Sequence, residues 1–411
     1  MPRRRRWTPV RGTGSRVYDL RERLLLAALD VPGRVWFSLR RLASGPPLAF
    51  DPAALREVLV LRLDRIGDVL MSFPALHDLR RALPGARIRL AVGAWSAEIA
   101  RNAPVDEVLV WSAPWAGRPQ DGASTFGELR SRARALRPAP PDLALDLQGD
   151  VRAMWLMQET GARWRAGYAN TGGRYLLTHV IPLDETVSWV EQNRRAVAAL
   201  VGTTAIEPTF QPLTPEDREF ATRLFATLDL ARRRPLVAIH PSGGRLVKEW
   251  PVERWAEVAL RLQEEQGATV LITGSEADRP LAERLARGLA ARPIDLTGRL
   301  TTRETLSVIA AVDLFLSPDT GPMHMACAVD TPSVTVFGPS DPVRYFSGGS
   351  GTTGTRHVVV RHDLWCAPCN LIRKPPAECA GPDAPECLRG VTPQSVYAEA
   401  ARLLERTRSR T

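Results

Sequence analysis

Residues 57–69 read EVLVLRLDRIGDV, and this stretch shows the alternation on which the fold depends. The apolar run at 58–63 is typical of a buried strand, and Gly67 permits a tight turn into a helix at 69–83. Similar apolar runs recur along the chain, with helical or loop stretches between them, at 88–92, 108–111, 143–147, 236–239, 270–273, 314–317 and 334–337. Uninterrupted apolar strands that alternate with helices predict parallel sheets covered on both faces.

This alternation weakens between residues 168 and 215, where Gly, Thr and Pro are frequent. We therefore expect an α/β protein with two doubly wound, Rossmann-like domains facing a cleft. Two domains also agree with the length of the chain, because a domain has about 150 residues. The expected segments are a basic extension (1–50), a first domain (51–231), a second domain (232–392) and a C-terminal helix (393–411). Such folds bind ligands where loops leave the carboxyl ends of the strands.

The composition excludes several classes of protein. Hydrophobic residues make up 44% of the 411 residues, which excludes a mainly disordered chain, and five cysteines are too few for a disulfide scaffold. The longest clean apolar run, 24–29, is far shorter than the roughly 20 residues of a membrane span. The sequence also lacks the Asp-x-Asp, Gly-x-Ser-x-Gly and His-Glu-x-x-His motifs, so it gives no support for hydrolase or metalloprotease chemistry.

The net charge of +10 is concentrated near the N-terminus. Residues 1–50 hold 11 Arg and 3 acids, whereas the other 361 residues hold 44 basic and 42 acidic groups. An enzyme that acts on nucleic acid usually carries basic charge along a groove in its body. A non-catalytic nucleic-acid-binding protein is therefore only a distant alternative, and we expect no nucleic-acid partner.

The extension at 1–50 contains an amphipathic helical pattern at 17–42. This segment either packs on the body or lies with its basic and aromatic residues on anionic lipid. Residues 7–16 are polar where a secretory signal would be apolar, so we expect a cytoplasmic protein, peripheral on the inner face of the cytoplasmic membrane if the lipid interpretation holds.

Asp68 follows the first strand and Gly67, at the start of the expected helix. A carboxylate at this position either caps the helix by accepting backbone N–H bonds, or acts as a general base at the carboxyl end of the strand. Both interpretations stay open on residue type alone.

The loop HPSGGRLVKEWP at 240–251 follows the first strand of the second domain. Small residues, including Gly243 and Gly244, let backbone N–H groups approach a phosphate, and Lys248 adds a mobile positive charge. Lys248 is notable because only two of the 55 basic residues are lysines. The loop lacks the Gly-Lys-Ser/Thr ending of a Walker motif, so it predicts a different kind of phosphate site.

The segment SPDTGPMH at 317–324 delivers Asp319, Thr320 and Gly321 from a strand to the start of a helix. Exposed N–H groups and the helix dipole at this point attract a phosphate or another anion. His324 lies in the first turn of that helix and is expected to face the same space.

Glu276 follows another strand of the second domain. It either hydrogen-bonds ribose hydroxyl groups, as acids near strand ends do in nucleotide-binding folds, or is an ordinary acid at a helix start.

Four cysteines lie close together in the sequence, at Cys366, Cys369, Cys379 and Cys387. The first pair has the spacing of zinc ligands, so these residues could form a structural zinc site, although the loose spacing of the second pair leaves free thiols or disulfides open. Cys327 falls in an expected helix and is interpreted as a core residue.

Taken in order, the motifs resemble glycosyltransferase family 9, the ADP-heptose:lipopolysaccharide heptosyltransferases. The resemblance runs from about residue 57 to 404 and rests on the Arg-x-x-x-x-Gly-Asp-Val segment, the His-Pro loop that ends in Lys-x-Trp-Pro, and Ser-x-Asp-Thr-Gly-x-x-His. It implies the GT-B fold, with the acceptor in the first domain and the donor in the second. It also implies an inverting transferase that needs no bound metal or other cofactor for chemistry.

The resemblance assigns roles to individual residues of this chain. It makes Asp68 the base and implies a donor site of Gly243, Gly244, Lys248, Glu276, Leu300, Asp319, Thr320, Gly321 and His324, with Leu300 lining the adenine pocket. The expected reaction is transfer of heptose from ADP-heptose to a lipopolysaccharide core or another cell-surface glycan. The alternative is a GT-B transferase or epimerase that uses another nucleotide sugar.

Overall fold

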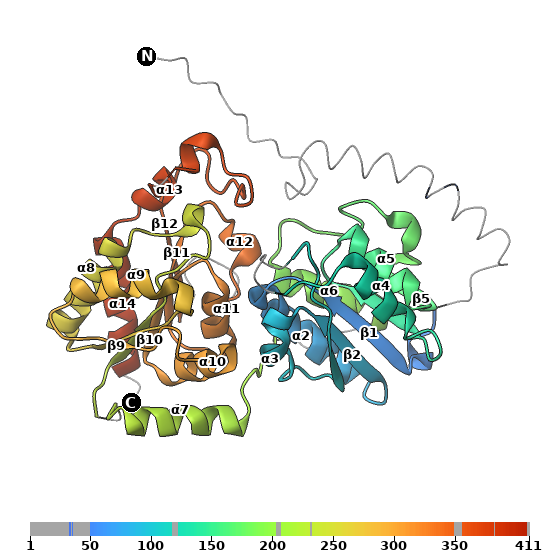
Figure 1. Cartoon of the computed structure of the whole chain (residues 1–411), viewed down its shortest axis with the longest axis horizontal. Coiled ribbons are helices and arrows are strands. Elements are labelled where there is room, and N and C mark those ends of the chain that lie inside the picture. Colours follow the sequence, from blue (N-terminus) through green and yellow to red (C-terminus); the bar gives the residue numbers. More distant parts are fainter. Residues whose placement is uncertain are drawn as a thin grey trace, which may run out of the picture. The chain divides into compact units, whose positions relative to one another are not determined.

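A computed structural model describes residues 33, 35, 50–116, 122–202, 207–230, 232–348, 356–381 and 383–408. The expected helix at 17–42 lies outside these residues, apart from Gly33 and Val35. The described chain forms two compact units that divide between Thr214 and Pro215 (Figure 1).

The first unit contains six strands and five α-helices in its described part. The strands are β1 Glu57–Arg62, β2 Arg87–Val92, β3 Glu107–Val110, β4 Leu143–Asp146, β5 Trp164–Gly167 and β6 His179–Val180. The helices are α2 Ile66–Ala82, α3 Ala97–Ala100, α4 Phe126–Arg134, α5 Val151–Glu159 and α6 Trp189–Val201, with short 3-10 turns η1 Pro52–Ala54, η2 Ala94–Ser96 and η4 Arg174–Leu176.

The second unit contains six strands and eight α-helices in its described part. The strands are β7 Leu236–Ile239, β8 Thr269–Ile272, β9 Ile294–Asp295, β10 Leu314–Pro318, β11 Ser333–Phe337 and β12 His357–Arg361. The helices are α7 Pro215–Thr227, α8 Val252–Gln266, α9 Arg279–Arg287, α10 Thr302–Ala311, α11 Gly321–Ala328, α12 Pro342–Tyr345, α13 Glu386–Arg389 and α14 Pro393–Arg408, with 3-10 turns η5 Leu246–Lys248, η6 Glu276–Asp278 and η7 Ala377–Cys379.

Both sheets are parallel and have the same topology. The first has the order β3-β2-β1-β4-β5-β6, and the second has the order β12-β11-β10-β7-β8-β9. Numbered within its own unit, each sheet is therefore 3-2-1-4-5-6, the Rossmann order. In the first sheet Val58 of β1 is aligned with Ile88 of β2 on one side and Leu143 of β4 on the other. The prediction of two doubly wound α/β units is confirmed.

The apolar runs of the sequence form the cores of the two units. Strand β1 is buried from Val58 to its end, and β10 and β11 are buried throughout. In the second unit, Trp250 and Trp255 pack edge to face at 4.6 Å, within a core shared by the strands, α8 and α14. Helix starts are capped where the sequence supplies the residues: Thr301 Oγ1 accepts from the Glu304 N–H at 3.2 Å, and Glu304 accepts from the Thr301 N–H at 2.7 Å.

The observed units differ from the expected segments at two places. Helix α7 groups with the second unit, where Asp217 forms an ion pair with Arg303 of α10, so the division falls 17 residues before the expected boundary at 231/232. The C-terminal helix α14 packs into the core of the second unit through Val396, Ala400 and Leu403. It is therefore an element of that unit.

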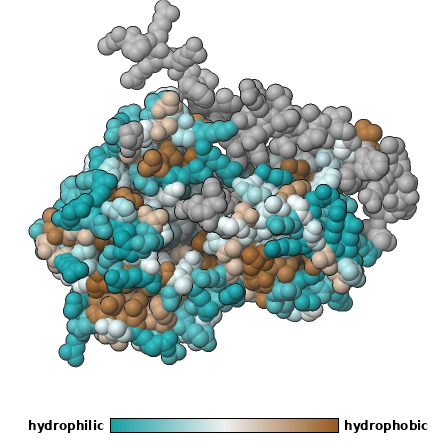
Figure 2. All heavy atoms as spheres, in the orientation of Figure 1, coloured by the Kyte–Doolittle hydropathy of each residue, from teal (hydrophilic) through white to brown (hydrophobic). Residues whose placement is uncertain are grey.

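Figure 2 shows hydrophilic residues over most of the visible face, with smaller hydrophobic areas between them. Among the described residues, no helix has the length and apolar character needed to cross a membrane.

Candidate active site

Each sheet has one point where the strand order reverses, and Asp68, Lys248 and Asp319 lie in segments that follow the carboxyl ends of the strands there. In the first sheet this point lies between β1 and β4, and in the second between β7 and β10. Loops that leave such a point diverge to opposite faces of the sheet and create a natural ligand site.

Four charged residues form the first cluster, which lies at the ends of β1 and β4. Arg62 ends β1 and is only 1% exposed, and Asp146 ends β4 and is fully buried. Arg62 Nε lies 3.2 Å from Asp64 Oδ1, and Arg62 Nη2 lies 3.4 Å from Asp68 Oδ1. Two carboxyl groups therefore lie within 3.4 Å of one buried guanidinium, and Asp146 is near enough to interact with its charge.

Asp68 is the third residue of α2 and is not its N-cap, which is Arg65. Its Oδ2 accepts a hydrogen bond from the Arg65 N–H at 3.3 Å, so it does satisfy one backbone donor at the helix start. The side chain keeps 25% of its surface exposed. The carboxylate is thus held at both oxygens and still open to solvent, as a proton acceptor requires.

Burial affects the two neighbouring carboxyl groups strongly. It raises the pKa of Asp64 to about 8, although the charge of Arg62 acts in the opposite direction. It raises the pKa of Asp146 to about 7, although the N–H groups of Gln148 and Gly149 donate to its carboxylate at 2.9 Å. Ionisable groups with raised pKa values beside an accessible carboxylate are a common feature of catalytic sites.

The second cluster begins with the loop after β7, whose shape depends on two glycines. A Cβ on Gly243 would lie 2.6 Å from the main-chain carbon and oxygen of Lys248, so only glycine allows this close approach. Gly244 has φ +68°, a left-handed conformation that favours glycine, and its N–H donates to Ser242 Oγ at 3.3 Å. The loop thus folds back on itself and brings Lys248 close to its start.

Lys248 and Asp319 are brought together by this loop and by the end of β10. Lys248 Nζ lies 2.8 Å from Asp319 Oδ2, and the two side chains are 17% and 7% exposed. Burial alone would raise the pKa of Asp319, but the charge and hydrogen bond of Lys248 outweigh it and lower that pKa. A positive charge is therefore held in place at the switch point of the second sheet.

The start of α11 lies directly after Asp319. Thr320 is the N-cap residue and Gly321 the first helical residue, so the helix N-terminus begins at the end of β10 as predicted. His324 is buried, and its Nδ1 lies 2.6 Å from Ser347 Oγ. This bond fixes the ring within the second unit.

Glu276 and Leu300 lie on neighbouring loops of the same sheet edge. The Glu276 carboxylate is 70% exposed and pairs with Arg279 at 2.5 Å. Leu300 is partly buried and precedes the N-cap of α10. The structure places both after strands of the second unit, and their predicted contacts with ribose and adenine stay predictions.

Sequence reasoning missed several charged residues of these clusters. Arg62, Asp64 and Asp146 form the first cluster with Asp68, and the available signals were an arginine and two acids within or directly after apolar runs. In the second unit, His240 lies 3.4 Å from Thr273 Oγ1, and burial lowers its pKa to about 4. A histidine directly after a buried strand was visible in the sequence, but it was interpreted only as part of the loop motif.

The four clustered cysteines are free thiols in the described structure, and so is Cys327. Burial is the main effect that raises the pKa of Cys366, Cys379 and Cys387, in the last case to about 12, and the neighbouring thiols act in the same direction. Within the described ranges, no group of three His, Cys, Asp or Glu side chains is arranged to hold a metal ion. Zinc at these cysteines therefore stays a prediction.

Two parallel, Rossmann-like sheets in one chain are the architecture of the GT-B class of glycosyltransferases. The chain belongs to glycosyltransferase family 9 (heptosyltransferase), whose family model matches residues 129–378. The resemblance seen in the sequence, the fold class and the enzyme class are confirmed.

Individual proteins are similar to this chain in sequence or in fold. Lipopolysaccharide heptosyltransferase 1 of Pseudomonas aeruginosa is 29% identical over 329 residues, which cover 76% of this chain and 86% of the relative. The crystal structure of a family 9 glycosyltransferase from Veillonella parvula has a TM-score of 0.70 at 21% identity and covers 87% of this chain and 99% of its own. The Escherichia coli heptosyltransferase WaaC with ADP-2-deoxy-2-fluoro heptose has a TM-score of 0.59 at 24% identity, with coverages of 74% and 93%.

Proposed function

We propose that this glycosyltransferase transfers heptose from ADP-heptose to a lipopolysaccharide core and inverts the anomeric carbon. The observation that carries the proposal is the accessible Asp68 carboxylate at one switch point, matched by the Lys248 loop at the other. The name of the P. aeruginosa relative supports the acceptor class, and the heptose analogue bound to WaaC supports the donor.

Asp68 is proposed to act as the general base. It takes the proton of an acceptor hydroxyl group while that oxygen forms a bond to the anomeric carbon of the donor. The bond between this carbon and the diphosphate oxygen breaks at the same time, and ADP leaves with the electron pair. Attack on the face opposite the leaving group inverts the configuration.

The donor diphosphate is proposed to bind in the second unit at Lys248, the N–H groups of Gly243 and Gly244, and the start of α11 at Thr320 and Gly321. The Lys248 ammonium has three donors, so it can contact the diphosphate while it keeps its bond to Asp319. The positive charge and the helix N–H groups stabilise the leaving ADP, so no step of the proposed reaction uses a metal ion. Glu276 and Leu300 are proposed to contact the ribose and the adenine, and Asp319 and His324 to lie beside the sugar or its phosphate.

Asp68→Asn is the direct test of the base. The assay follows ADP release from ADP-heptose with heptose-deficient lipopolysaccharide as acceptor, in the presence of EDTA. We expect kcat to fall by about 100-fold or more, the contribution typical of a general base, with an unchanged Kd for ADP. Wild-type turnover by Asp68→Asn would remove this residue from the mechanism, and loss of wild-type activity in EDTA would contradict the assignment of charge neutralisation to Lys248.

The identity of the donor can be tested separately with a panel of nucleotide sugars. We expect ADP-heptose to stabilise the protein against heat more than UDP-sugars do, because ligands that bind only the folded state raise Tm. Stronger stabilisation by a UDP-sugar would instead support the alternative transferase or epimerase.

We propose that residues 1–50 hold the enzyme at the cytoplasmic face of the membrane, where a lipid-linked acceptor is accessible. The support is their surplus of eight positive charges in an otherwise nearly neutral chain. Deletion of 1–50 should release the protein from liposomes that contain anionic lipid but leave ADP binding unchanged. Equal liposome binding by both forms would refute this role.

A structural zinc at Cys366, Cys369, Cys379 and Cys387 is proposed on the sequence spacing. Its test is elemental analysis of the purified protein, in which about one zinc per chain is expected. Protein that contains no zinc and has the same Tm as the protein as purified would refute the proposal.

A further inference from the structure

The buried Arg62 makes contacts that converge on Asp68, and a buried guanidinium needs such partners to offset its loss of hydration. Its Nε donates to the Asp68 carbonyl oxygen at 3.1 Å, and its Nη2 lies 3.4 Å from Asp68 Oδ1. Its Nη1 donates to the carbonyl oxygen of Leu147, directly after β4. One side chain therefore joins the ends of two strands to both the main chain and the carboxylate of Asp68.

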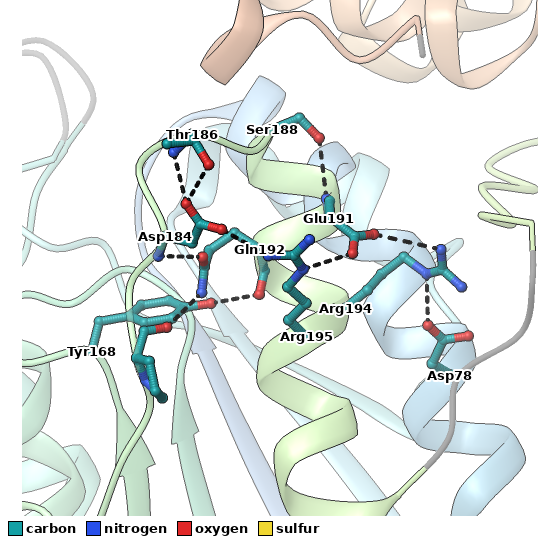
Figure 3. A network of polar contacts seen from close by, with 10 residues as sticks. Asp78, Tyr168, Asp184, Thr186, Ser188, Glu191, Gln192, Arg194 and Arg195 are labelled. Carbon is teal, nitrogen blue, oxygen red and sulfur yellow. Dashed lines mark hydrogen bonds and ion pairs between the residues drawn. The ribbon is translucent and has the colours of Figure 1, made fainter. Parts of the chain in front are cut away.

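Trp189 of α6 lies against the guanidinium, at 5.7 Å from the ring centroid to Arg62 Cζ. Tyr168 packs on this tryptophan at 6.0 Å, and its hydroxyl donates to the carbonyl oxygen of Gln192 at 3.1 Å. Figure 3 shows this tyrosine beside α6 and the contacts along the helix. Arg62 is thus enclosed by a helix that is itself fixed.

Helix α6 is in turn joined to α2, the helix that carries Asp68 in its first turn. Arg194 Nε lies 2.8 Å from Asp78 Oδ2, and both side chains are buried (Figure 3). Asn193 Nδ2 donates to the carbonyl oxygen of Met71 at 3.2 Å. The helix that carries Trp189 is therefore fixed to the helix that carries Asp68.

We propose that Arg62 is a positioning residue for the family reaction: it fixes the orientation of the Asp68 carboxylate toward the acceptor hydroxyl group. This inference rests on the proposed role of Asp68 as base. Each oxygen of the Asp68 carboxylate has its own partner, because Arg62 contacts Oδ1 and the Arg65 N–H donates to Oδ2. Arg62 Nε also lies 3.2 Å from Asp64 Oδ1, so a further carboxyl group helps to keep the guanidinium in this buried place.

The test compares Arg62→Lys and Arg62→Met with the matched control Arg89→Met. Arg89 is a buried arginine of the same sheet, 3.3 Å from Glu57 at the first residue of β1. A misplaced catalytic group can cost about 100-fold in rate, so Arg62→Met should lower kcat by roughly 10- to 100-fold and leave the KM for ADP-heptose and the Kd for ADP within about 2-fold. Arg62→Lys keeps the positive charge and can still donate a hydrogen bond, so it should recover most of the lost kcat. Arg89→Met should keep the wild-type kcat.

The outcomes separate this inference from the proposed function. Wild-type kcat in Arg62→Met, or an equal loss in Arg89→Met, overturns the role of Arg62 while leaving Asp68 as base. Failure of Arg62→Lys to recover any kcat, with a wild-type Tm, also overturns it. Full activity of Asp68→Asn would instead refute the base, and the positioning role with it.

Discussion

Replacement of Gly243 by alanine should open the loop that carries Lys248. An added Cβ would lie 2.6 Å from the main-chain carbon and oxygen of Lys248 and 2.9 Å from the Glu249 nitrogen. Favourable contacts between such atoms lie at about 3.5–4.0 Å, so these two main-chain segments must separate by roughly 1 Å. Neither neighbour is the flexible end of a side chain, and the loop itself has to change shape.

The size of the effect follows from two contributions. Overpacking of this kind lowers the free energy of unfolding by about 1–3 kcal/mol. Movement of the loop also takes Lys248 Nζ from its position 2.8 Å from Asp319. A hydrogen bond from a charged group is worth about 1.5–3 kcal/mol, so the Kd for ADP should rise by roughly 10- to 100-fold.

Isothermal titration calorimetry with ADP measures the second contribution, and Gly267→Ala provides the control. Gly267 ends α8 with φ +64°, and an added Cβ there meets no atom within 4 Å. Alanine at 267 should therefore cost about 1–2 kcal/mol of stability through backbone strain and leave the Kd for ADP unchanged. Wild-type affinity for ADP in Gly243→Ala would show that this loop does not hold the diphosphate through Lys248.

Three further predictions concern buried charges. Lys248→Met leaves the Asp319 carboxylate buried without its ammonium partner, so the free energy of unfolding in urea should fall by about 3 kcal/mol; an unchanged value would contradict the ion pair. Burial raises the pKa of Asp146 to about 7, so the folded chain keeps a proton that the unfolded chain loses near pH 4. The free energy of unfolding therefore falls as the pH rises from about 4 toward 7. Relative to Asp146→Asn, the wild type should therefore lose about 2–3 kcal/mol between pH 5 and pH 8, and a constant difference in urea denaturation would refute the shift. Arg194→Met should lower stability by about 2–3 kcal/mol, whereas the exposed Arg195→Met should change it by less than about 1 kcal/mol; equal effects would count against the buried pair between α6 and α2.

The fold could be predicted from the sequence because its strands are continuous apolar runs. The run at 58–63 became β1, and the run at 143–147 became β4 beside it. The start of the second unit was harder to predict. The amphipathic pattern of α7 shows that the helix is half buried, but it does not show which sheet the helix covers, and the ion pair between Asp217 and Arg303 depends on tertiary contacts.

The candidate site could be proposed from the sequence only where its expected chemistry coincided with a local motif. Asp68 follows a turn glycine, and Lys248 is one of two lysines in the chain, so both residues were recognisable. Arg62 was not, because 53 of the 55 basic residues are arginines and a single one carries little information. Its importance arises from burial and from the convergence of β1 and β4, which are properties of the folded chain.

The two units have the same topology, but the accessible charged group at the switch point is a carboxylate in the first unit and an ammonium in the second. At the first switch point, the buried Arg62 contacts the accessible carboxylate of Asp68, which we propose takes a proton from a hydroxyl group. At the second, Asp319 holds the ammonium of Lys248, which we propose binds the donor diphosphate together with the main chain at Gly243 and Gly244. In both places a buried partner fixes the orientation of the charged side chain before a ligand binds. Binding therefore costs less conformational entropy. Substitution of the buried partners Arg62 and Asp319 should therefore affect the reaction through the groups that they hold.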